Sequence, residues 1–197
     1  QNVFLGYYTG AKLTSGCNNI IMGNSAGVEI TTTNANVILG NYAGQKIQGA
    51  ENVYISHCAG RCMCNGDSNV AIGQCALRGS STVSNNTGAC NVAIGMGAGD
   101  GMTSGSNNIL LGRVAGDSIT TGSCNIVIGC GSDVSSATGN KQFIIGVGGS
   151  KWICGDSSFN IYDKNGTLIA AGFNPDDQGN LYAGTGAGAE SDADTCF

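Results

Sequence analysis

The sequence predicts an all-β protein, a β-solenoid (β-roll) of about nine 17-residue coils followed by a small C-terminal β-hairpin segment. Three observations lead to this prediction: a short apolar motif recurs at a nearly constant spacing, glycines separate the apolar clusters, and no helical periodicity is present. Apolar residues make up 41% of the 197-residue chain, which is more than a disordered glycine-rich chain contains. The glycines therefore mark turns between strands.

The repeated motif is a pentapeptide that reads Asn, then Val or Ile, an apolar residue, Ile, Leu or Met, and Gly. Eight copies open at asparagines spaced 16, 17 or 22 residues apart: Asn2, Asn19, Asn36, Asn52, Asn69, Asn91, Asn108 and Asn125. A ninth copy opens at Gln142. Because such a short unit cannot bury a face alone, neighbouring units must stack. The length suits one coil made of a strand, a glycine turn, a second short strand and a second glycine turn.

The asparagines are expected to form one column, because stacked coils lie about 4.8 Å apart, the spacing of paired strands. Stacked carboxamides hydrogen-bond along such a ladder, and Gln142 keeps the amide group. A simple preference of Asn for turns is the alternative explanation. Strand alternation then assigns the second and fourth positions of the motif, such as Val3 and Leu5, to the interior of the coil. Small residues at the next corner, such as Ala26, join them there.

The third position of the motif would then face away from the coil interior, yet it is apolar in every copy. It holds Phe4, Ile21, Ile38, Tyr54, Ala71, Ala93, Leu110, Val127 and Ile144. A strand that is apolar on both faces is usually buried on both faces. We therefore expect an intersubunit seam, with Phe4, Ile21, Ile38, Tyr54, Leu110 and Ile144 in the interface. A wide coil with two cores is the alternative.

Composition excludes several classes of protein. The formal net charge is −5 without any basic run, so the chain is not expected to bind nucleic acid. No apolar stretch approaches the roughly 20 residues that span a bilayer. Ten cysteines favour an oxidising compartment, which places the protein outside the cell, on a cell surface or on a virion surface. With one histidine and no paired Cys motif, neither a metal site nor another cofactor is expected.

No catalytic constellation is recognisable, and the chain is not expected to be an enzyme. His57 is next to Cys58, but neighbouring residues of a strand point to opposite faces, so the two side chains should not meet. Asp100, Asp117 and Asp133 nearly share a column. They form an acidic stripe, a calcium ladder or a row of solvated corners, and we favour solvated corners.

Two departures from the repeat carry further hypotheses. The fifth unit has a polar insertion at residues 79–86, which contains an N-glycosylation sequon at Asn85, and a second sequon starts at Asn165. Cys58 and Cys75 are the seventh residues of consecutive units. They should lie one above the other, about 5 Å apart, within the range for a disulfide.

The predicted domains are the solenoid at residues 1–146, a β-hairpin insertion at 147–179, and a further coil at 180–197. The hairpin is expected over residues 159–170, with Asn165 and Gly166 in its turn. The unit opened at Asn180 would continue into the next copy, so that chains join end to end near Cys196.

The motif Asn-Val-Ala-Ile-Gly followed by x-x-Ala, over residues 1–146, resembles the head repeats of trimeric autotransporter adhesins and related repeats of phage and algal-virus tail fibres. The resemblance implies a left-handed β-roll, three chains side by side, and a role in surface attachment. The predicted function is a structural subunit of an extracellular or virion fibre, which associates with itself as a homotrimer, an end-to-end polymer or both. The alternative is an adhesin head that binds a cell-surface receptor or glycan.

Overall fold

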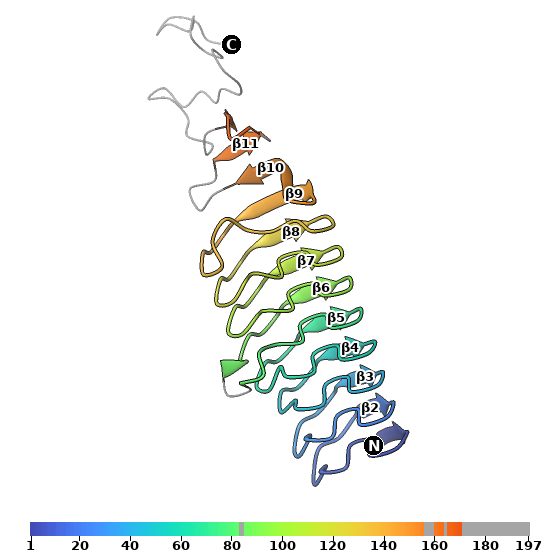
Figure 1. Cartoon of the computed structure of the whole chain (residues 1–197). Helices are drawn as coiled ribbons and strands as arrows, with labels where there is room; N and C mark the ends of the chain where they lie inside the picture. Colours follow the sequence, from blue (N-terminus) through green and yellow to red (C-terminus); the bar gives the residue numbers. More distant parts are fainter. Residues whose placement is uncertain (83–84, 156–159, 164, 171–197) are drawn as a thin grey trace, which may run out of the picture.

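The computed structural model describes residues 1–82, 85–155, 160–163 and 165–170. The chain winds into a long stack of coils, with the N-terminus at one end (Figure 1). Within these ranges, twelve strands form one continuous sheet, in which they follow the order of the sequence. The predicted all-β solenoid with a spacing of about 17 residues is confirmed.

The first nine strands are parallel and in register. They are β1 (Asn2–Leu5), β2 (Asn19–Met22), β3 (Val37–Leu39), β4 (Val53–Ile55), β5 (Val70–Ile72), β6 (Val92–Ile94), β7 (Ile109–Leu111), β8 (Ile126–Ile128) and β9 (Phe143–Val147). Each strand pairs with the equivalent residues of the next unit, for example Ile21 with Ile38. The five additional residues of the fifth unit leave the register intact, since Ala71 still pairs with Ala93.

The parallel stack ends where the repeat ends. Strand β10 (Ser150–Gly155) folds back antiparallel on β9, and β11 (Ile161–Asp163) and β12 (Leu168–Ala170) continue the sheet antiparallel. The β11–β12 pair is the predicted hairpin. Its turn is held by the Asp163 carboxylate, which accepts hydrogen bonds from the backbone N–H groups of Asn165 and Thr167, both at 2.8 Å. The β9–β10 turn at Gly148 and Gly149 was not predicted, and residues 180–197 lie outside the described ranges.

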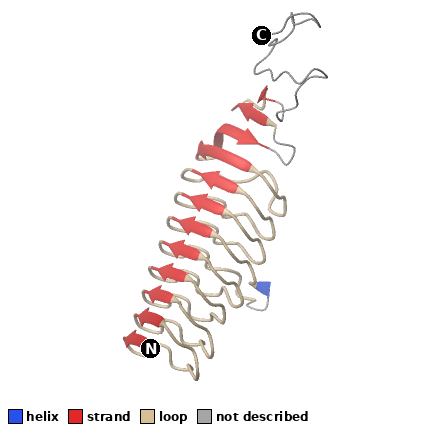
Figure 2. Cartoon of the chain, turned by 180° about the vertical axis from the view of Figure 1, so that it is seen from behind, coloured by secondary structure: helices blue, strands red, loops and turns tan. Residues whose placement is uncertain are grey.

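Each coil contains one strand, whereas the sequence analysis expected two. The strands line one side of the stack, and turns and loops form nearly all of the rest (Figure 2). We call the part of each coil between one strand and the next the return path. Residues there with a left-handed backbone, such as Tyr42 at φ 56° and Gly44 at φ 51°, are incompatible with a strand. The coils still bond to one another there, because the Gly27 N–H donates to the Ala43 carbonyl at 3.0 Å and the Gly44 N–H to the Ala59 carbonyl at 2.9 Å.

The predicted assignment of the two strand faces is wrong. The third position of the motif lies inside the coil, where Ile21, Ile38, Tyr54 and Leu110 are fully buried and Ile144 is 1% exposed. Phe4 occupies the same column in the terminal coil and is 41% exposed. The six predicted interface residues, Phe4, Ile21, Ile38, Tyr54, Leu110 and Ile144, are therefore members of the interior column, not of a subunit seam.

The opening asparagine explains the error. Its side chain points into the coil, and alternation along the strand puts the third position on the same side and the second and fourth positions outside. The interior is completed by two further columns from the return path. One holds alanines (Ala26, Ala43, Ala59, Ala76, Ala98 and Ala115), and the other holds larger side chains (Ile30, Ile47, Met63, Met102 and Ile119).

Ser56 occupies a position that the other units reserve for glycine. The glycines after the strands adopt φ values such as 137° at Gly40, and Ser56 follows with φ 114°. At Gly40 an added Cβ would lie 2.5 Å from the Ser56 carbonyl oxygen, because successive corners stack closely. A side chain in this backbone conformation is strained.

Replacing the serine should therefore stabilise the protein. We expect Ser56→Gly to raise the free energy of unfolding by about 1 kcal/mol, and Gly40→Ser to lower it by about 1–3 kcal/mol. Thermal unfolding followed by circular dichroism checks both. A stability of Ser56→Gly at or below that of the wild type would show that the corner tolerates a side chain.

Candidate functional site

The opening asparagines form a continuous hydrogen-bonded column inside the stack. Asn36, Asn52, Asn69, Asn91, Asn108 and Asn125 are fully buried, and Asn19 is 1% exposed. The Asn91 Oδ1 atom shows the recurring pattern, since it accepts bonds from the backbone N–H and from Nδ2 of Asn108, each at 3.0 Å. At the far end the Gln142 N–H donates to Asn125 Oδ1 at 2.8 Å, so glutamine continues the column.

Apart from that of Asn36, each asparagine carboxamide also ties the two ends of its own coil together. The Nδ2 group donates to a backbone carbonyl on the return path, usually 14 residues later, as from Asn91 to Gly105 at 2.9 Å and from Asn108 to Gly122 at 3.0 Å. One side chain thus bonds both within its coil and to the coil before it. A turn preference of Asn does not account for this geometry.

Tyr54 modifies the column at one coil. Its hydroxyl donates to Asn52 Oδ1 at 3.1 Å, beside the bond that this oxygen accepts from the Asn69 N–H at 2.8 Å. Full burial raises the pKa of Tyr54 well above its ordinary value, so the phenol stays protonated and keeps donating.

Loss of one carboxamide should be costly. Asn91→Ala leaves the Gly105 carbonyl and the Asn108 N–H buried without these partners, so we expect a loss of about 3 kcal/mol or more in unfolding free energy. Asn41→Ala is the matched control, because Asn41 is exposed, and its effect should be small. Urea unfolding measures both. Equal stabilities of the two variants would contradict a structural role of the column.

The second and fourth positions of the motif form the outer sheet face. Its two columns are Val3, Ile20, Val37, Val53, Val70, Val92, Ile109, Ile126 and Phe143, and Leu5, Met22, Leu39, Ile55, Ile72, Ile94, Leu111, Ile128 and Ile145. All of these residues are apolar and none is fully buried, with exposures of 40% at Ile109 and 42% at Ile94. Eight steps of about 4.8 Å make the face about 38 Å long.

Such a face is comparable in size to the largest apolar patch on a typical monomer, which is often functional. With two side chains per strand it is roughly 10 Å wide, so its area is on the order of 400 Å². Continuous apolar patches of this size commonly mark interaction sites. An apolar seam was predicted from the sequence at the third position of the motif rather than here, because the motif is apolar on both sides of each strand.

His57 and Cys58 do approach each other, contrary to the sequence analysis. Both lie in the turn after β4, where Cys58 adopts φ 57°, so the alternation of a strand does not apply. The Cys58 Sγ and His57 Nε2 atoms are 3.5 Å apart.

Cys58 is buried, and its predicted disulfide partner Cys75 is half-buried, with a pKa raised by its burial and by the nearby Cys58. Both are free thiols in this structure, so the predicted disulfide is not formed.

The aspartates of the return path interact with one another. Asp117 is exposed as a residue, but partial desolvation of its carboxyl group raises its pKa, and the neighbouring carboxylate of Asp133 raises it further. Asp100 pairs with Arg78, with 2.7 Å between the carboxylate and guanidinium atoms. Within the described ranges no group of three His, Cys, Asp or Glu side chains is arranged to hold a metal ion.

The raised pKa of Asp117 makes stability depend on pH. A folded-state pKa above the unfolded value means that Asp117 favours folding most below about pH 4, and that this contribution is lost as the pH rises through the folded pKa. We expect Asp117→Asn to raise the Tm at pH 7 by on the order of 1 °C, because the site is exposed. At pH 3 the two proteins should melt together. A larger difference at pH 3 than at pH 7 would contradict this account.

Both sequons lie on accessible turns. Asn85 is exposed at the end of the insertion, and Asn165 is exposed in the turn between β11 and β12. Glycosylation at either asparagine remains a prediction.

No protein-family model matches this chain, and no curated protein or solved structure matches it either. The resemblance to adhesin heads and tail fibres therefore remains a prediction. The described part of the chain has no helix of the length and apolarity needed to cross a membrane.

Proposed function

We propose that the protein is a structural subunit of an extracellular or virion fibre, in which copies of the solenoid associate through their outer sheet faces. The outer sheet face is the observation that carries this proposal. Its eighteen positions, two on each of nine strands, contain no charged or polar side chain. Covering such a face removes apolar surface from water and stabilises the assembly.

A second copy of the chain is the occupant that fits this face best. The face presents side-chain ridges every 4.8 Å or so along the stack. Another stacked sheet offers ridges at the same spacing, and two sheets pack face to face about 10 Å apart with interdigitating side chains. Since the face carries no charge, an oppositely charged partner would gain nothing from it.

A stack of this kind also has the rigidity that a fibre needs. Every coil contacts only its neighbours, and backbone hydrogen bonds and the asparagine column connect them. Parallel association of several copies around one axis, such as the trimer that the resemblance implies, would bring the outer faces together and keep all chains pointing in one direction. The end-to-end contact would involve residues 180–197, outside the described ranges, and stays a prediction.

Charges placed on the outer sheet face should prevent association. We expect the wild type to sediment as an oligomer, and the double variant Ile72→Lys/Leu111→Lys to sediment as a monomer with an unchanged circular dichroism spectrum. These residues are only partly buried in the single chain, so lysines there can reach water. Sedimentation velocity measures the outcome.

The matched control is Ser104→Lys/Ser118→Lys, which adds the same charge at exposed positions of the return path. It should assemble like the wild type. The proposal fails if the wild type is a monomer at about 100 μM, a concentration at which weak interfaces already associate. It also fails if the outer-face variant sediments like the control.

A further inference from the structure

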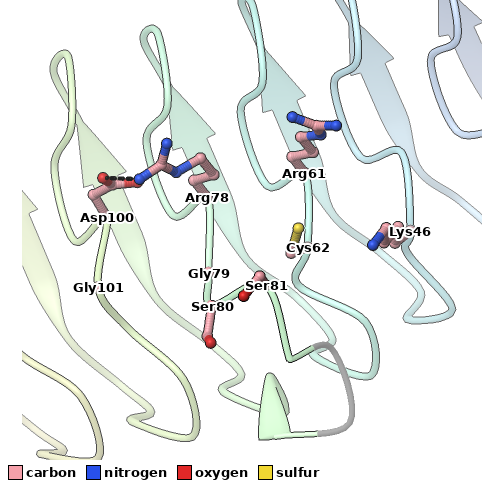
Figure 3. Close-up of a pocket in the computed structure, with 9 residues that line it drawn as sticks. All are labelled: Lys46, Arg61, Cys62, Arg78, Gly79, Ser80, Ser81, Asp100 and Gly101. Carbon is pink, nitrogen blue, oxygen red and sulfur yellow. Dashed lines mark hydrogen bonds and ion pairs between the residues drawn. The ribbon is translucent and has the colours of Figure 1, made fainter.

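Three of the eight basic residues of this acidic chain gather beside one hollow. Lys46, Arg61 and Arg78 come from three consecutive coils, and the hollow that they line holds about 610 Å³ (Figure 3). We call this the basic hollow. Asp100 is the only acidic residue among the described residues that line it, so their three positive charges and one negative charge leave a net charge of +2.

The insertion of the fifth unit builds one wall of the basic hollow. Ser80 and Ser81 from this insertion also line it, on the same coil as Arg78. The base of the insertion is fixed by the fully buried Asn86, whose Nδ2 donates to the Cys62 carbonyl at 2.8 Å and to the Ser80 carbonyl at 2.7 Å. The one lengthened coil thus adds two serines to the lining of the basic hollow.

The three basic side chains differ in the contacts that they already make with other groups of the protein. The Arg61 Nε atom donates to Gln45 Oε1 at 2.9 Å, and its guanidinium lies 5.3 Å from the centre of the Tyr42 ring. These contacts hold the group in place and leave its two terminal nitrogens for a ligand. Lys46 forms no ion pair with any described residue, whereas Arg78 donates to Asp100 at 2.7 Å.

We propose that the basic hollow binds an oxyanion, and specifically a sulfate ester carried by a saccharide chain. Guanidinium groups match the geometry of oxyanions, and the serine hydroxyls can hydrogen-bond to sugar oxygens. None of the described residues that line the hollow has an aromatic side chain on which a nucleobase would stack, which favours a saccharide over a nucleic acid. The site would let a fibre hold an acidic polysaccharide at a fixed point along its length.

Isothermal titration of the assembled protein with a heparin-derived hexasaccharide tests this proposal. The sulfated hexasaccharide should bind, its desulfated counterpart should not, and inorganic sulfate should bind more weakly. Arg61→Gln should weaken binding of the sulfated probe at least about tenfold, as expected for loss of a charge-assisted hydrogen bond. Asp100→Asn should strengthen binding several-fold, because it frees Arg78 and raises the net charge of the hollow.

Arg113→Gln is the matched control, because it removes the same charge from an exposed site outside the basic hollow. It should bind the sulfated probe like the wild type. Equal losses in Arg61→Gln and Arg113→Gln would show general attraction to a polyanion and overturn the proposal. Equal binding of inorganic sulfate and the hexasaccharide would overturn the assignment to a saccharide. Melting curves of all variants verify that they are folded.

Discussion

The asparagine column is the constraint on which the rest of the structure depends. From Asn19 to Asn125 each carboxamide of the column is buried, and a buried amide that lacks partners costs several kcal/mol, so its bonds must be satisfied in these coils. The column satisfies them only if the next asparagine lies directly above and if the return path brings a carbonyl within reach. Stacking register, coil closure and the inward direction of the third motif position all follow from that requirement.

The spacing of the motif was sufficient to predict the stack of coils. It was not sufficient to predict which side of each strand points into the coil, because both assignments fit the same spacing. The interval between asparagines was enough to predict the stack and its register, and Asn165 with Gly166 was enough to predict the hairpin. The strand faces were assigned the wrong way because Val3, Phe4 and Leu5 are all apolar. Alternation of side chains along the strand therefore does not show which of them point into the coil. If the opening asparagine had been treated as a buried group that needs hydrogen-bond partners, the third position of the motif would have been assigned to the interior, as observed.

The other misses come from backbone conformation. Left-handed residues such as Cys58 turn the return path away from strand geometry, which brings His57 to Cys58 and eliminates the second strand of each coil. The basic hollow was missed because Lys46, Arg61 and Arg78 are separated by 15 and 17 residues and form no run in the sequence. Irregularities concentrate in the fourth and fifth coils, where Ser56 replaces glycine and the insertion occurs, and departures from a regular pattern often mark functional sites.

The central claim is that copies of the chain associate through their outer sheet faces. Electron cryomicroscopy of the assembled protein tests this claim most directly. The account predicts that the outer faces of neighbouring copies lie about 10 Å apart, the distance between packed sheets, with the Ile72 and Leu111 side chains covered by the neighbour. An assembled particle in which these side chains face solvent in every copy would contradict it.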